Sequence, residues 1–219
     1  MKNLLFNHKF IKNWQLLILL LCLNEIMLIG VREALEPGFV IGGFVHMPEK
    51  SYDLETFKNH VKTVYRYALI LLPFIMTLKY ILLGLFLQMA FTIQFKDLPF
   101  KKSFRIVMIA SFSQLFAGLA RYAMFIKNNL EPGSGRIQEI IPFGIISFFD
   151  TSSLNPSTFF LLNQFNIFEI FWCLLIYQGL VYYRIDSREN LRRLIPIIWL
   201  TFVFLQFLSV LVSYQLIEI

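Results

Sequence analysis

Residues 65–93 read YRYALILLPFIMTLKYILLGLFLQMAFTI, and this stretch decides the fold of the chain. It is longer than the roughly 20 apolar residues that an α-helix needs to cross a bilayer. Pro73 lies in its first third, where a proline is expected to kink a membrane helix without ending it. The stretch therefore predicts a long, kinked transmembrane helix.

The composition of the whole chain points the same way. Of its 219 residues, 57% are hydrophobic, 25 are Phe and only 16% are charged, whereas soluble domains have about 25% charged residues. This chain has too few polar groups to cover the surface of a soluble domain. The composition excludes a soluble globular protein, a disordered chain and a disulfide scaffold, and it indicates a polytopic membrane protein.

Five apolar runs are candidate spans. They cover about residues 14–30, 65–93, 104–126, 167–183 and 194–214. Lysines precede the first run, as in a signal peptide, but no A-x-A-like cleavage site follows it, so we expect an uncleaved helix. The sequence thus predicts a single all-α domain over residues 1–219, a membrane bundle of five transmembrane helices.

Two further apolar stretches are too short to span. Residues 38–45 contain three glycines, and residues 137–149 are interrupted by Pro142 and Gly144. Runs of this length more often lie in the membrane interface or re-enter the membrane. They fall in connectors 31–64 and 127–166, which the five spans place on the same side.

The distribution of Lys and Arg gives the orientation. With a cytoplasmic N-terminus, the inner segments carry eleven Lys and Arg residues and the longer outer segments carry seven. Cytoplasmic loops are the ones enriched in positive charge, so we expect the N-terminus inside and the C-terminus outside. The net charge of +6 is then a mark of topology, and no nucleic-acid partner is expected.

Two predicted inner loops concentrate these charges. They could dock on anionic lipid or on a partner, or they could serve orientation alone. Ser187 precedes the last span and is a candidate helix cap. The basic residues at the loops are Lys96, Lys101, Lys102 and Arg105, followed by Arg184, Arg188, Arg192 and Arg193.

Four ionisable residues lie within the spans or at their edges: Glu25, Lys79, Arg121 and Glu169. A charge at the centre of a membrane helix costs about 2.5–3.5 kcal/mol on insertion scales, so each requires a reason. Helix geometry puts Glu25 and Arg121 about 7–8 Å below the outer boundary, with Glu169 at a similar or shallower level. We expect Lys79 to lie deeper, near the middle of its helix.

Two interpretations of this polar layer remain open. It can be a polar cavity that binds a substrate, a lipid headgroup or an ion. Alternatively, it can be an ion pair that fixes helix packing, with Lys79 snorkelling towards the interface.

The sequence contains no recognisable catalytic constellation. The H-E-x-x-H, G-x-S-x-G and P-loop motifs are absent, and no His or Cys has a partner at metal-ligand spacing. Cys22 and Cys173 lie in apolar runs, where we expect reduced thiols. We therefore expect no enzymatic activity, no metal and no cofactor.

Two stretches resemble the bacterial branch of the Ypt-interacting-protein (Yip) family. The first, FKDLPFKKSFRIVMIASFSQL at 95–115, has a short polar turn, a phenylalanine, a basic pair and an apolar helix. The second has Asn166, Phe168 and Trp172 at a helix entry, Gly179 late in that helix, and a Ser-started basic turn. The resemblance covers about residues 70–212.

The resemblance implies five helices with a cytoplasmic N-terminus and no enzymatic activity. Eukaryotic members act with small GTPases in vesicle traffic, but this chain has no long segment before its first span. We therefore expect a non-catalytic subunit or scaffold of a bacterial inner membrane, with membrane lipid and either a membrane protein or a second copy as partners. The alternative is a transporter or permease component that uses the polar layer.

Overall fold

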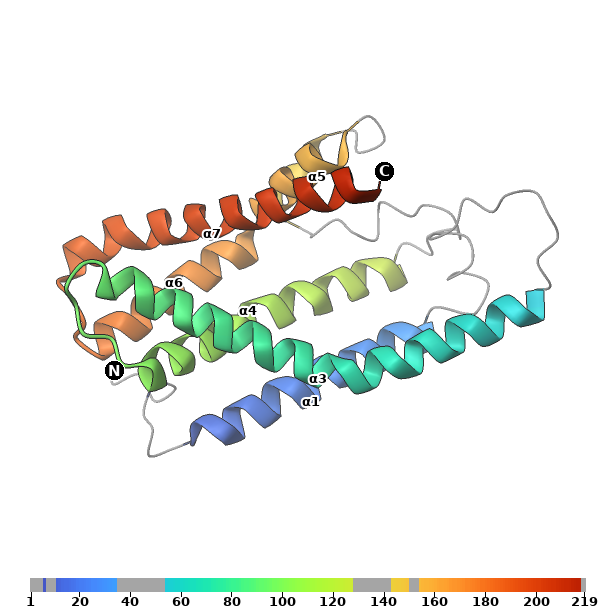
Figure 1. Cartoon of the computed structure of the whole chain (residues 1–219), viewed down its shortest axis with the longest axis horizontal. Coiled ribbons are helices and arrows are strands. Elements are labelled where there is room, and N and C mark those ends of the chain that lie inside the picture. Colours follow the sequence, from blue (N-terminus) through green and yellow to red (C-terminus); the bar gives the residue numbers. More distant parts are fainter. Residues whose placement is uncertain (1–5, 7–10, 35–53, 128–142, 150–153, 218–219) are drawn as a thin grey trace.

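The computed structural model describes residues 6, 11–34, 54–127, 143–149 and 154–217, and every regular element in these ranges is helical. Figure 1 shows an elongated bundle of long helices. In chain order the elements are α1 (Asn13–Ala34), α3 (Leu54–Thr92), α4 (Phe100–Lys127), the 3-10 helix η3 (Ile145–Phe148), α5 (Pro156–Gln164), α6 (Ile167–Tyr182) and α7 (Arg188–Ile217).

A helix occupies each of the five predicted spans. Among the described residues, three helical segments are long and apolar enough to cross a membrane: Leu69–Thr92, Phe100–Arg121 and Arg188–Leu208. Asn13–Met27 and Ile167–Tyr182 are shorter apolar segments. The structure therefore confirms a helical protein with at least three membrane-spanning candidates.

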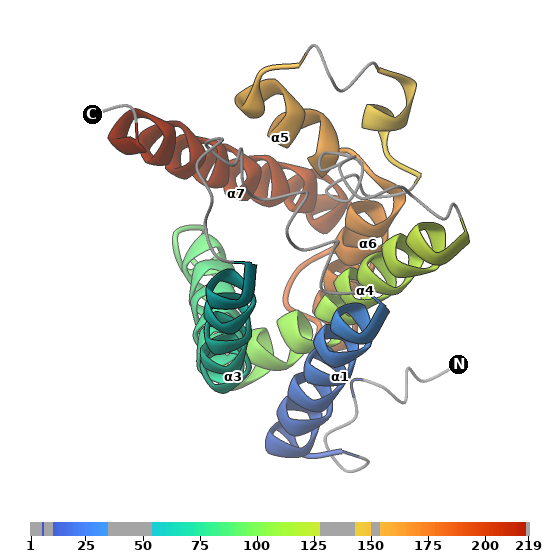
Figure 2. The ribbon, with the colours of Figure 1, turned by 90° about the vertical axis from the view of Figure 1, so that its right-hand side faces the viewer.

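Helix α4 is the centre of the bundle. It packs against α6, α3 and α1, while α7 packs against α6 and α5. Figure 2 shows α3 and α7 as separate outer helices on one side of the bundle. In the most apolar stretch of α4, 61% is buried inside the bundle. The corresponding stretches of α3 and α7 are only 17% and 22% buried. The described core thus forms around α4, and α3 and α7 present most of their surface to the surroundings.

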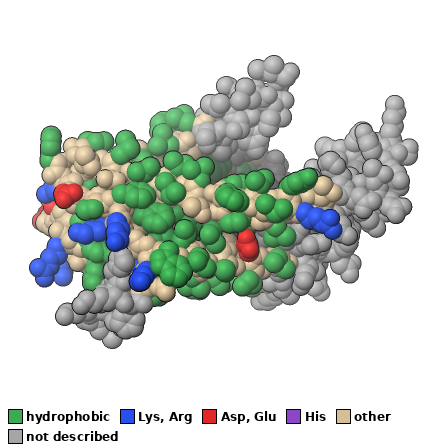
Figure 3. All heavy atoms as spheres, turned by 60° about the horizontal axis from the view of Figure 1, so that its bottom comes forward, with side chains coloured by type: hydrophobic (Ala, Val, Ile, Leu, Met, Phe, Trp, Pro, Cys, Tyr) green, Lys and Arg blue, Asp and Glu red, His purple; other side chains and the backbone are tan. Residues whose placement is uncertain are grey.

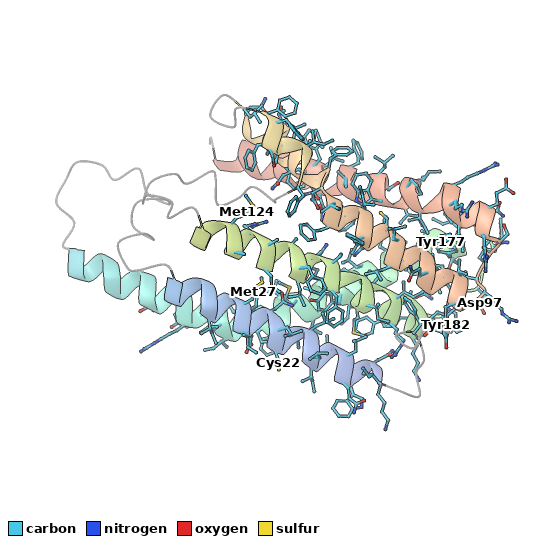
Figure 4. The ribbon with its side chains drawn as sticks, turned by 180° about the vertical axis from the view of Figure 1, so that it is seen from behind. Cys22, Met27, Asp97, Met124, Tyr177 and Tyr182 are labelled. Carbon is cyan, nitrogen blue, oxygen red and sulfur yellow. The ribbon has the colours of Figure 1, made fainter. Side chains whose placement is uncertain are left out.

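The two ends of the bundle differ. At one end, α1 begins beside the start of α4, where Asn13 Nδ2 donates to the carbonyl of Lys101 at 3.2 Å. The loop after α3 meets the loop after α6 there, because Lys96 pairs with Asp186 at 3.1 Å. We call this the basic end and the opposite one the far end. Figure 4 places Asp97 and Tyr182 at the basic end and Met124 at the far end of α4.

Several helix boundaries differ from the predicted spans. Helix α3 begins at Leu54, and α7 begins at Arg188, so both extend beyond their apolar runs. Ser187 caps α7 as predicted, because its Oγ accepts from the backbone N–H of Asn190 at 3.3 Å. The continuous α3 helix contains Pro73.

The predicted outer segments are described only in part. Residues 38–45 and 137–142 lie outside the described residues. The remainder of the second segment forms η3, which packs against α5. Helix α5 was not predicted. It begins where Asn155 Oδ1 accepts from the backbone N–H of Thr158 at 2.7 Å and Pro156 takes the first helical position, both typical of a helix start.

Candidate functional site

Four helices each contribute one polar side chain to a cluster inside the bundle. The Lys79 ammonium group donates to Gln114 Oε1 at 2.9 Å. Gln114 in turn forms a side-chain hydrogen bond with the Glu169 carboxylate, which also accepts from the indole N–H of Trp199 at 3.2 Å. We call Lys79, Gln114, Glu169 and Trp199 the polar cluster; it joins α3, α4, α6 and α7.

The start of α6 positions the acid of this cluster. Asn166 is the N-cap residue, and its Oδ1 accepts from the backbone N–H groups of Phe168 and Glu169, both at 3.0 Å. This cap holds Glu169 in the first helical turn, where the helix dipole favours a negative charge. The ring of Phe165 meets Trp199 edge to face at 5.3 Å, so the indole is held on both its ring and its N–H.

The cluster lies at one level across the bundle. Lys79 is thirteen residues from the basic end of α3, and Glu169 is thirteen residues from the basic end of α6. At 1.5 Å per residue, both α-carbons are about 20 Å from that end. A hydrocarbon core of about 30 Å that begins at the basic end would place the cluster in its far half.

The structure brings together two of the four predicted residues of the polar layer, Lys79 and Glu169. Lys79 lies deeper than Arg121, as expected, but Glu169 lies deeper than its predicted level, because Gln114 links it to Lys79. Arg121 is seven residues beyond Gln114 along α4, about 10 Å closer to the far end. Glu25 is partly buried on α1, and neither ion pair found among the described residues involves it.

Sequence reasoning missed Gln114 and Trp199. Gln114 is a polar side chain in the middle of a span, and Trp199 is a tryptophan away from either end of its span. Both positions are signals in themselves, because membrane tryptophans gather at the interfaces and mid-span amides hydrogen-bond between helices. A second polar contact joins α1 to α3, where Asn24 Nδ2 donates to the Tyr80 hydroxyl at 3.3 Å.

The basic end carries the predicted loop charges, with one correction. Arg105 lies inside α4 and is only 1% exposed, so it is not a loop charge available to lipid. Lys96 is paired with Asp186, Arg193 is paired with Glu189 at 2.7 Å, and Lys102 lies over the Tyr183 ring at 5.5 Å. Figure 3 shows Lys and Arg side chains gathered at this end. Exposed basic residues there are Lys101, Arg184, Arg188, Arg192 and Arg193.

Arg105 instead anchors the chain that leads into α1. Its Nη1 donates to the carbonyl of Ile11 at 2.7 Å and to Asn13 Oδ1 at 3.1 Å. These bonds run between the start of α4 and residues at the start of α1. A buried guanidinium with oxygen acceptors of this kind acts as a structural clamp.

Phe6 is a second anchor at the basic end. Its side chain is 1% exposed, and its carbonyl accepts from the Tyr183 hydroxyl at 2.9 Å. Its ring lies 5.8 Å from that of Tyr182. Gly179 makes room for it, because a Cβ there would be 2.8 Å from both Phe6 and Ile106.

In the part of the chain that the structure describes, no three His, Cys, Asp or Glu residues lie together as a potential metal site. Cys22 and Cys173 are free thiols, as predicted. Comparison with protein-family models, with curated proteins and with solved structures finds no match to this chain.

Proposed function

We propose that this chain is a five-crossing protein of a bacterial-type inner membrane, with the basic end in the cytoplasm and the end of α7 on the other side. Support comes from helices at all five predicted positions, from loops of one end that contact each other, and from the exposed Lys and Arg of that end. Positive charge retained on the cytoplasmic side is the usual arrangement.

We further propose a non-catalytic subunit or scaffold of the Yip type, which acts through contacts with membrane lipid, a membrane-protein partner or a second copy. The outward surface of α3 carries this proposal. Only 17% of the most apolar stretch within Leu69–Thr92 is buried, and the Phe74 side chain is 71% exposed. Such a face is available along the whole span to neighbouring helices and acyl chains.

A photo-crosslinking amino acid tests this proposal. Placed at Phe74, it should capture a discrete protein partner, a second copy or lipid after illumination in membranes. The matched control is Leu83 on the same helix, which is 5% exposed and should yield only crosslinks within the chain. Mass spectrometry of the products, and of the protein purified in mild detergent, would identify the partner. Equal yields at both positions, with no retained protein or lipid, would contradict the proposal.

The polar cluster supports a second candidate, a transporter or permease component. Charged residues within membrane spans often mark a substrate or ion pathway. A Lys79→Cys variant tests this candidate, in a background where Cys22→Ser and Cys173→Ser remove the native thiols. Reaction with a membrane-impermeant thiol reagent would favour a water-filled pathway. Protection of the introduced thiol, beside a reactive Ser187→Cys control, would exclude it.

A further inference from the structure

The polar cluster holds two opposite charges that do not touch. Within the described ranges, the ion pairs are Lys96–Asp186 and Arg193–Glu189, so no direct ion pair joins Lys79 to Glu169. The Gln114 amide lies between them, with its oxygen facing the cation and a hydrogen bond to the acid. The site therefore presents a cation and an anion separated by about the length of one small polar group.

The cluster is partly accessible. Lys79, Gln114, Glu169 and Trp199 all keep part of their surface exposed. Helices α3 and α7, which hold the two ends of the cluster, are not among the closely packed helix pairs, although the rings of Phe86 and Phe202 meet between them at 6.1 Å. Their neighbouring residues Leu78, Leu82 and Leu200 are exposed and apolar. Polar groups reached through such surroundings have few polar partners available except a lipid headgroup or water.

A buried donor next to the cluster lacks an acceptor. Trp172 is 5% exposed, and its indole N–H has no hydrogen-bond partner in the described structure. It follows Glu169 by three residues on α6, so the two share a helix face, and its ring stacks on Phe202 of α7. Buried donors are nearly always paired in folded proteins, so this enclosed N–H adds an unmet donor to the α6 face that carries Glu169.

We propose that the polar cluster binds the zwitterionic headgroup of an aminophospholipid. Lys79 would pair with the phosphate and Glu169 with the ammonium group. A purely anionic headgroup offers no cation to Glu169, and a choline headgroup has no N–H to donate to it. This inference rests on the lipid contacts of the proposed function.

Lipid retention tests the choice of headgroup. The intact protein is purified from nanodiscs that contain equal amounts of phosphatidylethanolamine, phosphatidylcholine and phosphatidylglycerol, and bound lipid is counted by native mass spectrometry. We expect retention of phosphatidylethanolamine about tenfold above each of the others, as one charge-assisted hydrogen bond allows. Equal retention of all three, or preference for phosphatidylglycerol, would overturn the inference.

Three variants keep the test specific. Glu169→Gln should abolish the preference, and Trp199→Phe, which removes the donor to Glu169 but keeps an aromatic ring, should weaken it. Asp186→Asn removes a paired acid at the basic end and should leave the preference unchanged. Each variant is compared only as a monodisperse, folded preparation. Unselective lipid retention contradicts the headgroup inference alone, whereas absence of any retained lipid or protein also contradicts the proposed function.

Discussion

The Lys79 ammonium group and Oε1 of Gln114 are 2.9 Å apart, a charge-assisted hydrogen bond between α3 and α4. Gln114 continues the contact to Glu169 on α6, and Trp199 on α7 completes it. One polar side chain from each of four helices thus meets at a single level. A cation and an anion that share a neutral bridge carry no net charge into the membrane, which lowers the free energy required to bury them.

Coupling between Lys79 and Glu169 gives the first prediction. Lys79→Met or Glu169→Gln alone removes a hydrogen bond to a charged group and leaves the opposite charge without its counterpart, so each should destabilise the protein by about 1–3 kcal/mol. The double variant should lose clearly less than the sum of the two single losses. Unfolding in detergent, followed by the loss of helical signal, measures all four proteins of this cycle. Additive losses would show that the two residues do not interact.

Gly179 gives the second prediction. A Cβ at this position would lie 2.8 Å from Phe6 and from Ile106, both fully buried, so Gly179→Ala should destabilise the protein by about 1–3 kcal/mol. The control is Gly118→Ala, whose Cβ would meet only the flexible end of Met27 and should be nearly neutral. Thermal unfolding of the two variants compares them directly. Equal melting temperatures would contradict the placement of Phe6.

The Tyr183 hydroxyl gives the third prediction. It donates to the carbonyl of Phe6 at 2.9 Å, so Tyr183→Phe should reduce stability by about 1 kcal/mol and expose the chain before α1 to protease. Tyr182→Phe keeps the ring contact with Phe6 and serves as the control. If both variants are cleaved at the wild-type rate, the N-terminal anchor does not depend on this bond.

Asp186 gives a prediction about pH. The backbone N–H of Ser187 and the hydrogen bonds from Lys96 and Asn190 hold the pKa of Asp186 below its ordinary value. A carboxyl group whose pKa is lower in the folded state stabilises the protein above its unfolded pKa, about 3.9. That stabilisation is lost as the pH falls through the folded pKa.

The measurement compares wild type with Asp186→Asn. The difference in melting temperature should be constant from about pH 5 to pH 8 and should shrink below about pH 4. Glu189→Gln, from the exposed pair with Arg193, is the matched control and should have little effect at any pH. A difference that persists unchanged at low pH would show that Asp186 acts without its charge.

The positions of the long helices could be predicted from sequence because each is an apolar run of roughly membrane length. The true start of α3 could not, because residues 54–64 are mixed and charged and contribute nothing to a hydropathy signal. Helix α5 did leave a local signal in Asn155 followed by Pro156, the cap and first position of a helix.

The contacts within the polar cluster could not be predicted from the sequence. Helices that are apolar on most faces carry little periodic signal for which side turns inward, so nothing in the local pattern placed Gln114 between Lys79 and Glu169. Arg105 was assigned to a loop because counting Lys and Arg for orientation takes no account of burial. Its partners Ile11 and Asn13 are distant in sequence.

Cysteine labelling tests the five-crossing arrangement most directly. Cys22→Ser and Cys173→Ser first remove the native thiols. Single cysteines then replace, one at a time, the exposed residues Lys12, Lys101, Thr158 and Ser187, and a tag marks the C-terminus. We expect a membrane-impermeant maleimide to label positions 12, 101 and 187 only from the cytoplasmic side, and position 158 and the tag to be reached only from the other side. Labelling of positions 101, 158 and 187 from one side would contradict the crossings of α4 and α6.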